Sequence, residues 1–290
     1  MTIDLLSIFM EDMKLRRMSP GFAESNYYRV RAYLQWCDAR GLDPLQTTRE
    51  DILAYLRHHQ GSRTKTLANI FSALASFYEL LEERGESSSA VHVRNIRKKY
   101  LRSYKSDSAE RQIISVEEAA RMVVATLDTR DRAMLLLLLK TGIRRGELAS
   151  LETSDIDMRR MEIRLKPTAK RSNRTVFFDE EAREALVRWL KIRPSSDTLF
   201  PLCGHAVGVA IAKAAERVGL HERGAPLEKR FGPHCCRHWF TTHLLRSGMP
   251  REYVKWLRGD AIKEAVDIYY HIDSEDVRRS YLAHIPRLGI

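Results

Sequence analysis

The feature that most restricts the fold of this chain is a helical spacing of apolar residues, which recurs in four stretches before residue 85. In the longest stretch, from about Thr64 to Arg84, leucine, isoleucine and phenylalanine recur every three or four residues. Such spacing gives a helix one apolar face, which it buries against other helices. Pro and Gly residues separate the stretches and leave only short connections. We therefore predict a compact four-helix domain over residues 1–85.

A change of composition after Gly85 indicates a linker. Residues 85–90 read Gly-Glu-Ser-Ser-Ser-Ala, and the stretch that follows is rich in Lys and Arg with few acids. Flexible basic segments can follow a nucleic-acid backbone by displacing its counterions. We predict a basic linker over residues 86–112, in which Arg97, Lys98 and Lys99 contact nucleic acid.

The charge of the chain also points to a polyanionic partner. The net charge of +11 and the pI of about 9.6 come from Lys and Arg residues spread along the sequence. A folded protein with such a surface has nucleic acid as its first candidate partner. Arg63 and Lys65 belong to a basic group near the third turn, which either contacts phosphates or is simply solvated.

Residues 113–290 combine helical and alternating patterns. Helical spacing predominates, but Met161, Ile163 and Leu165 alternate with polar residues, and residues 174–178 repeat an extended pattern. A polar turn over residues 167–173 joins these two stretches into a predicted antiparallel hairpin. The second domain is therefore predicted to be α+β, and the whole chain mainly α with a small antiparallel β-sheet.

The remaining composition argues against export, a disulfide framework, a membrane span and a metal site. The four cysteines show neither regular spacing nor a C-x-x-C pair, and acids stand where a signal peptide carries basic residues. The longest apolar run, Ala133 to Leu139, is too short to span a bilayer. Neighbouring His234, Cys235, Cys236 and His238 on one helical turn cannot all face one ion. We expect a soluble, cytoplasmic protein without a metal or a membrane partner.

The candidate site centres on His234, Arg237 and Tyr269. The histidine and the arginine share a helix face at spacing i, i+3. With a downstream tyrosine they supply what an enzyme needs to attack a phosphodiester with a side chain instead of a metal-bound water. An ordinary polar helix face is the alternative for such a cluster taken alone.

Two further basic elements precede this cluster. Arg144 or Arg145 lies at a predicted helix start, where backbone amides also favour phosphate, and Glu147 can hold a guanidinium in place. The hairpin turn projects Lys170, whose ammonium can protonate a leaving oxygen. A basic hairpin tip that touches a nucleic-acid backbone is an equally natural reading of this lysine.

These motifs together resemble the tyrosine recombinases of the phage integrase and Xer type. The stretch Thr141–Leu148, the lysine-bearing hairpin, His234-x-x-Arg237-His238 and Tyr269-x-His271 occur in the family's order and at about its separations. The four-helix domain looks like the family's core-binding domain, so the resemblance covers nearly the whole chain. It implies the catalytic residues Arg144, Lys170, His234, Arg237, Asp260 and Tyr269, supported by Glu147, His238 and His271.

The resemblance implies a site-specific recombinase that needs no cofactor. In that chemistry Tyr269 attacks a DNA phosphate, forms a 3′-phosphotyrosyl link and frees a 5′-hydroxyl, which attacks a partner strand to give a Holliday junction. The implied partner is double-stranded DNA with a specific recombination site, bound by a homotetramer that is a monomer or dimer when free. An accessory DNA-bending factor, a nucleoid location and a C-terminal helix (Ser274 to Ile290) exchanged between protomers also fit the family. A last helix that folds back on its own domain is the alternative to this exchange.

Some assignments stay open at this stage. The family commonly has His or Trp where this chain has Asp260, which either orients catalytic groups, accepts the proton of the nucleophile or only caps a helix. Lys166 is the alternative to Lys170, because the hairpin turn differs in length from the family pattern. Arg171 and Arg174, in and beside that turn, are expected to contact DNA.

Two other functions share the expected fold. A type IB topoisomerase would relax one duplex, and a DNA-binding regulator would have kept the fold and lost the chemistry. The Arg-Gly-Asp triplet at residues 258–260 and residues 267–272 also resemble integrases of archaeal viruses and plasmids.

Overall fold

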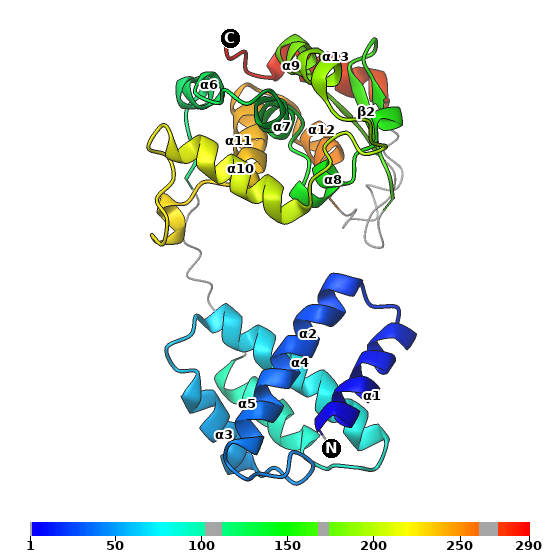
Figure 1. Cartoon of the computed structure of the whole chain (residues 1–290), viewed down its shortest axis with the longest axis vertical. Helices are drawn as coiled ribbons and strands as arrows, with labels where there is room; N and C mark the ends of the chain where they lie inside the picture. The colour runs from blue at the N-terminus through cyan, green and yellow to red at the C-terminus, as the bar shows by residue number, and fades with distance from the viewer. Residues whose placement is uncertain (1, 102–111, 168–173, 261–271) are drawn as a thin grey trace. The chain divides into compact units, whose positions relative to one another are not determined.

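The computed structural model describes residues 2–101, 112–167, 174–260 and 272–290, and it divides the chain into two compact units, Met1–Ser108 and Ala109–Ile290 (Figure 1). The described part of the first unit is helical: α1 (Thr2–Leu15), α2 (Pro20–Asp38), α3 (Arg49–His58), α4 (Thr64–Glu83) and α5 (Ala90–Tyr100). The second unit has the helices α6 (Val116–Val124), α7 (Thr129–Thr141), α8 (Arg145–Ala149), α9 (Glu180–Ile192), α10 (Gly204–Glu216), α11 (Pro233–Arg246), α12 (Arg251–Arg258) and α13 (Ser274–His284). Its strands are β1 (Ile156–Asp157), β2 (Glu162–Leu165) and β3 (Arg174–Phe177).

The first unit contains the four helices that the apolar spacing predicts. Thr48 accepts a hydrogen bond from the backbone of Asp51, whose side chain bonds back to Thr48, so a capping box starts α3 as expected. Helix α4 contributes a buried face that includes Phe71 and Tyr78. The Tyr78 hydroxyl lies 2.7 Å from the hydroxyl of Tyr33 and donates to the carbonyl of Pro44, so the aromatic core also satisfies its polar atoms.

The segment predicted as a linker differs from that prediction, because residues 90–100 form the fifth helix of the first unit. Ala90, Val93 and Ile96 of α5 are at most 1% exposed and pack in the same core as α4. Arg94 adds a bidentate contact to Glu82 of α4, at 2.9 and 3.2 Å. This short apolar stripe lies among basic residues, and the high charge of the segment led to the prediction of a linker instead of a helix. The basic side chains therefore stand on a packed helix instead of on a free linker.

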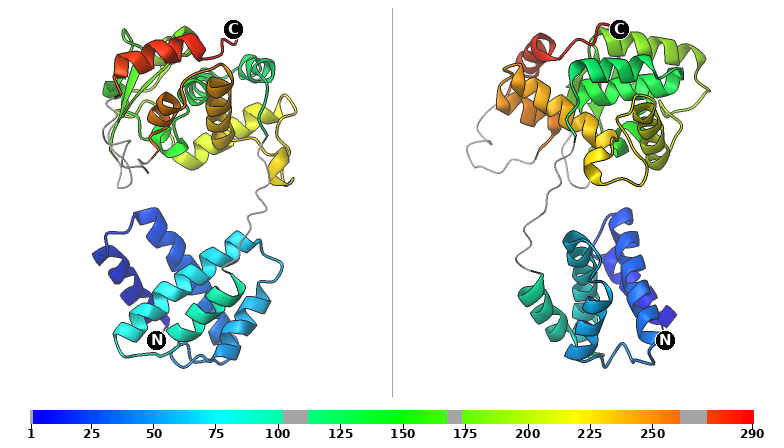
Figure 2. Two further views of the ribbon diagram at one scale, coloured as in Figure 1. Left: turned by 180° about the vertical axis from the view of Figure 1, so that it is seen from behind. Right: turned by 90° about the vertical axis from the view of Figure 1, so that its left-hand side faces the viewer.

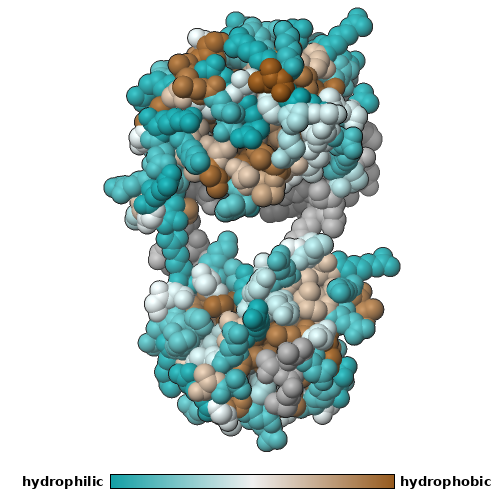
Figure 3. All heavy atoms as spheres, viewed as in Figure 1, coloured by the Kyte–Doolittle hydropathy of each residue, from teal (hydrophilic) through white to brown (hydrophobic). Residues whose placement is uncertain are grey.

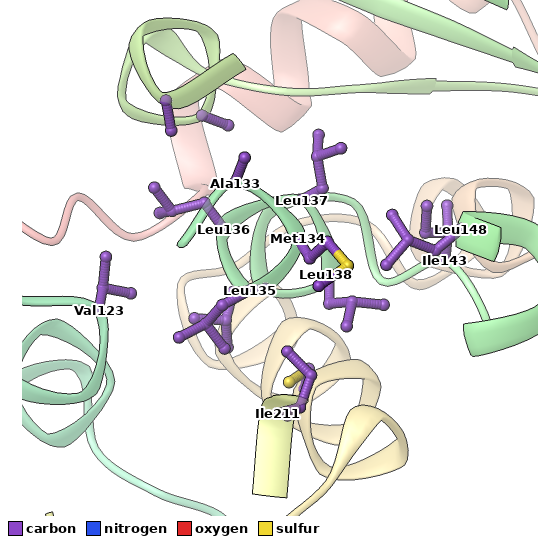
Figure 4. Close-up of a cluster of buried hydrophobic side chains, with 14 of the residues drawn as sticks. Val123, Ala133, Met134, Leu135, Leu136, Leu137, Leu138, Ile143, Leu148 and Ile211 are labelled. Atoms are coloured by element: carbon purple, nitrogen blue, oxygen red, sulfur yellow. The ribbon is translucent and has the colours of Figure 1, made fainter. Parts of the chain in front are cut away.

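Helix α7 is the central element of the second unit, and it is buried on all sides from Ala133 to Thr141. It packs against α9, α10 and α11, and Figure 4 shows its leucines pointing toward different neighbours, with Ile143 and Leu148 beyond its end. A helix that is apolar all round belongs in the middle of a core. The seven-residue apolar run in the sequence is therefore part of a buried helix.

The predicted hairpin is present and has one further strand. The strands form an antiparallel sheet in the order β1-β2-β3, with Ile163 opposite Val176. Helices α12 and α13 contact β3, and the views in Figure 2 show the sheet at one side of the unit. The two-residue strand β1 was not predicted, because so short a stretch carries no alternation. The fold class, mainly helical with a small antiparallel sheet, is confirmed.

The C-terminal helix α13 packs within its own unit. Tyr281 is fully buried and donates a hydrogen bond of 2.8 Å to the carbonyl of Lys140 in α7. Its exchange between protomers stays a prediction. Figure 3 shows hydrophilic residues over most of the visible face of each unit. No helix in the described ranges is long and apolar enough to cross a membrane.

Candidate active site

The end of α7 brings two distant segments together. Gly142 ends the helix in the left-handed conformation, with φ at +60°. A Cβ atom on this residue would lie 2.3 Å from the ring of Phe240 in α11, so only glycine allows this close approach. The chain then starts α8, with Arg144 just before the first helical residue. The loop between α7 and α8 therefore lies directly against α11.

Helix α11 separates its polar and apolar residues as the sequence suggested. His234 and His238 are exposed on one face, with ring centroids 4.6 Å apart and rings nearly perpendicular. Cys235 and Cys236 are buried in the core instead, and burial raises the pKa of the Cys236 thiol well above its ordinary value. Because the four side chains point to different surroundings, they do not converge on one ion.

Arg237 is the buried cation of the site, with its side chain only 6% exposed. Its guanidinium donates to the carbonyl of Gly142 at 2.7 Å and to the carbonyl of Arg258 at 2.7 Å. Burial, helped by the neighbouring charge of Arg258, lowers the pKa of Arg237 to about 10. The group is still protonated at neutral pH, so it places a fixed positive charge at the start of α11.

A pocket of about 410 Å³ opens between the start of α8 and the start of α11. Arg144, Arg145, His234 and Arg237 all line it, and none of its described lining residues is a carboxylate. Guanidinium groups match the oxygens of a phosphate, and backbone N–H groups at a helix start add to the attraction. The pocket therefore has the size and charge to hold a phosphate group.

Glu147 supports the site in a different way from the one expected. It accepts a hydrogen bond from the backbone N–H of Arg144 at 2.7 Å and only a long one, 3.4 Å, from the Arg144 guanidinium. Its two oxygens accept the main bonds from the guanidinium of Arg174, at 3.0 and 2.9 Å. The carboxylate thus links the start of α8 to the start of β3.

Arg174, for which a DNA contact is predicted, is buried in the described structure, and that contact stays a prediction. The residue is 9% exposed, and its guanidinium lies inside the unit between Glu147 and the carbonyl of Leu257. The physical reason is the position of Arg174 at the start of β3, where its side chain points inward beneath the end of α12. Three of its five N–H donors bond to protein acceptors.

Asp260 lies beside the two arginines that frame the end of α12. One carboxylate oxygen is 3.5 Å from Arg237, and the other is 3.0 Å from Nε of Arg258 in an ion pair whose angle makes no hydrogen bond. The backbone N–H of Asp260 also bonds to the carbonyl of Lys255, after the left-handed Gly259. Both the orienting role and the capping role predicted for Asp260 are compatible with this position.

Several predicted site residues cannot be placed. Lys170, Arg171, Tyr269 and His271 lie outside the described residues. The alternative lysine, Lys166, is described at the end of β2, about half exposed and 2.5 Å from Glu152.

The residues of the first unit that are predicted to contact DNA belong to the described part of the chain. Arg63, Lys65, Lys98 and Lys99 are exposed, and Arg97 is partly buried. Their contact with DNA stays a prediction.

Sequence reasoning missed the part played by the end of α12. The carbonyl of Arg258 accepts a hydrogen bond from Arg144 at 3.4 Å as well as the bond from Arg237. The glycine after it was the available signal, since a glycine at a helix end marks a left-handed turn that exposes the last carbonyls.

Comparison with protein families agrees with this arrangement. The model of the phage integrase family matches residues 106–276, and the model of the phage integrase N-terminal SAM-like domain matches residues 5–85. Together the two models include both structural units.

Individual proteins are similar along most of the chain. Tyrosine recombinase XerC of Bacillus pumilus is 28% identical over 98% of this chain and 96% of its own. XerC of Vibrio parahaemolyticus is 30% identical over 79% of this chain and 74% of its own. Tyrosine recombinase XerD of Chlorobaculum tepidum is 28% identical over 97% and 96%. These relatives are bacterial, and the archaeal source stays a prediction.

Solved structures show the same fold. A lambda integrase (residues 75–356) dimer bound to a COC′ core site has a TM-score of 0.68 at 18% identity, covering 93% of this chain and 97% of the other. The Tn1549 transposon integrase in complex with a circular intermediate DNA has a TM-score of 0.67 at 17% identity, with 96% and 98% covered.

Proposed function

The chain belongs to the phage integrase family and is a site-specific recombinase that breaks and rejoins DNA, and from this premise we propose that the pocket between α8 and α11 holds the scissile phosphate. The observation that supports the proposal most is the convergence of Arg144, His234 and Arg237 on one pocket, whose lining contains no carboxylate in the described part of the chain. Cations fixed before the substrate arrives stabilise the charge that develops on phosphate oxygens during attack.

The arginines differ in how they are held, and the difference suggests separate tasks. Arg237 is anchored by two carbonyl groups and cannot follow a moving ligand. Arg144 has a side chain 32% exposed, and its hydrogen bonds within the described ranges are long, at 3.4 Å, so it can turn toward a phosphate. We assign the fixed charge to Arg237, the adjustable grip to Arg144 and a hydrogen bond to a non-bridging oxygen to His234.

The bond changes follow from this assignment. The phenol oxygen of Tyr269 attacks the phosphorus and loses its proton, while the bond from phosphorus to the 5′-oxygen breaks and that oxygen takes up a proton. The product is a 3′-phosphotyrosyl ester and a free 5′-hydroxyl. Attack of a 5′-hydroxyl from the partner strand reverses these steps and releases Tyr269, so the number of phosphodiester bonds is conserved.

The lysine that protonates the leaving oxygen is proposed to come from the β2–β3 hairpin. Lys170 is the first choice, and Lys166 at the end of β2 is the alternative. A substrate with sulfur in place of the 5′-bridging oxygen distinguishes them, because a thiolate leaves without a proton more readily than an alkoxide. Replacement of the responsible lysine by methionine should slow cleavage of the oxygen substrate strongly and of the sulfur substrate little.

We further propose that a homotetramer acts on two DNA duplexes at a specific recombination site in the cytoplasm, in association with the nucleoid. The relatives named XerC and XerD are tyrosine recombinases, and the lambda integrase structure is a dimer on a core site. Assembly on DNA can be measured by light scattering of the protein with and without a bound duplex.

The decisive experiment traps the covalent intermediate. A nicked duplex, selected for binding from a random-sequence pool, loses its short 5′-hydroxyl fragment after cleavage and leaves the protein attached to DNA. Wild type should form the adduct, Tyr269→Phe should form none, and the matched variant Tyr270→Phe should still form it.

Each other outcome has one meaning. An adduct with Tyr269→Phe would show that another residue is the nucleophile. Binding without any adduct from wild type would favour the DNA-binding regulator over the enzyme.

A further inference from the structure

Arg174 connects three elements that are far apart in the sequence. From the start of β3, its Nε donates to the carbonyl of Leu257 in α12 at 3.1 Å. Its two terminal nitrogens donate to Glu147 in α8 at 3.0 and 2.9 Å. The side chain is 6% exposed, and the carboxylate that it meets is 11% exposed. One guanidinium therefore fixes the distance between the start of α8 and the end of α12.

Arg144 and Arg237, two of the three arginines that line the pocket, depend on the elements that Arg174 joins. The carbonyl of Arg258, next to Leu257, accepts hydrogen bonds from Arg144 at 3.4 Å and from Arg237 at 2.7 Å. On the α8 side, Glu147 accepts the backbone N–H of Arg144. Arg174 thus bonds to the residue that precedes the shared carbonyl of Arg258. It also bonds to the carboxylate of Glu147, which holds the backbone of Arg144.

Arg174 packs closely against Gly259. Gly259 has φ at +59°, and a Cβ atom there would lie 2.8 Å from Cδ of Arg174 and 2.9 Å from its Nε. Such distances are too short for a carbon atom, so a side chain at this position would displace the guanidinium. The glycine therefore serves two needs, the left-handed turn and the space for Arg174.

Arg174 is not placed to bind the phosphate itself. It does not line the pocket that Arg144 and Arg237 line. Its charge is also offset by direct contact with Glu147. A role through other residues fits better than contact with substrate.

We propose that Arg174 is a positioning residue, which holds the end of α12 against the start of α8 so that Arg144 and Arg237 converge on one phosphate. This inference rests on the roles proposed above for those two arginines. Lysine cannot replace Arg174 in this task, because a single ammonium does not bridge a carboxylate and a carbonyl in the fixed fork of a guanidinium.

The test uses the full chain with the conservative variant Arg174→Lys. Displacement of catalytic groups by about 1 Å can cost about 100-fold in rate, so single-turnover adduct formation should fall by that order. The Kd for the uncleaved duplex and the Tm should stay close to the wild-type values. Arg188→Lys is the matched control, because it changes an exposed arginine that pairs with Glu184 in α9 of the same unit, and it should leave all three measurements unchanged.

Two further variants test the geometry. Glu147→Gln should slow adduct formation to a similar extent, and the double variant should be no slower than the slower single one, because both changes break the same link. Gly259→Asn tests the packing, since asparagine tolerates the left-handed turn but brings a Cβ atom against Arg174. It should slow adduct formation as Arg174→Lys does.

The results that overturn the inference are distinct from a failure of the proposed function. Wild-type speed in Arg174→Lys would show that Arg174 does not position the site. Arg174→Lys could instead weaken DNA binding and reduce the slope of log K against log salt concentration by about 1. That result would make Arg174 a phosphate contact. A wild-type protein that binds DNA and forms no adduct would contradict the proposed function itself.

Discussion

Two clusters of charged residues, one buried and the other partly buried, lie near the C-terminal end of α7, and they differ in their balance of charge. The tail cluster consists of Lys140, Asp179 and Glu181. The arginine cluster consists of four cations and two carboxylates: Arg144, Arg174, Arg237, Arg258, Glu147 and Asp260. Both combine basic side chains with carboxylates, but only the second has positive charge in excess.

The tail cluster is closed. The ammonium of Lys140 is fully buried, 2.6 Å from Asp179, 2.5 Å from Glu181 and 2.6 Å from the carbonyl of Pro286. Glu181 also accepts the backbone N–H groups of Leu288 and Gly289. Every strong donor and acceptor is used within the protein, so the cluster fastens the C-terminal segment and has nothing to offer a ligand.

The arginine cluster is open on one side. Arg144 and Arg237 face the pocket, while the two carboxylates stay outside its lining. Unbalanced buried charge is costly for folding unless a counter-charge arrives. The comparison teaches that two properties distinguish a ligand site from a structural ion pair. These are the sign of the excess charge in the cluster and the presence of a pocket beside it.

The largest effect is expected from removal of the fixed charge of the arginine cluster. Arg237→Gln keeps a similar length but no charge, and loss of one preorganised group should slow adduct formation by about 100- to 1,000-fold. The Tm should stay near the wild-type value, because fewer like charges remain in the cluster. Quench-flow measurement of the adduct checks the rate, and a drop in Tm with an unchanged rate would make Arg237 a structural residue.

Removal of the cation from the tail cluster should affect stability instead of rate. Lys140→Met leaves Asp179 and Glu181 without their cation, and breaking a buried pair in this way costs about 3–5 kcal/mol of unfolding free energy. Denaturant titration measures the loss. Adduct formation by the folded fraction should change much less than in Arg237→Gln, and an equal loss of rate would show that the two clusters do not have separate functions.

The pH dependence of the tail cluster follows from Glu181. Burial alone would raise the pKa of this carboxyl, but the hydrogen bonds from Lys140 and the backbone of Leu288 lower it below the ordinary value of 4.5. A lowered folded pKa gives stabilisation that is present above the unfolded pKa and is lost as the pH falls through the folded pKa. Wild type should therefore be more stable than Glu181→Gln at pH 7, and the difference in Tm should shrink below about pH 4. A difference that stays constant down to pH 2 would contradict this ion pair.

The smallest effect is expected at Asp260. Its contact with Arg237 is long, and its side chain is 34% exposed, while Arg237 keeps two carbonyl partners in Asp260→Asn. A partly exposed pair contributes up to about 1 kcal/mol, so adduct formation should change by about fivefold or less. A loss of about 100-fold or more would instead assign proton transfer to Asp260. Asp276→Asn, which removes an exposed partner of Arg279 in α13, is the control.

The sequence predicted the parts of this protein that depend on neighbouring residues. Apolar spacing located α1 to α4, and the capping boxes of Thr48 and Ser115 start the helices that they precede. The same reasoning placed His234 and Arg237 on α11 and Arg144 at a helix start. Each of these depends on contacts within a few residues, which a linear pattern records.

Only the tertiary structure decided which distant groups meet. Arg174 looked like a surface arginine beside a basic turn, but it reaches a carbonyl 83 residues away in the chain. The sequence of helix α5 resembles a linker, and only its packing against α4, which buries its three apolar residues, identifies it as part of the first unit. The sequence identified Asp260 as a candidate residue, but only the position of α12 shows that it lies beside Arg237. Local spacing fixes helices and strands, whereas the partners of a charged side chain depend on the packing of segments far apart in sequence, which no short pattern contains.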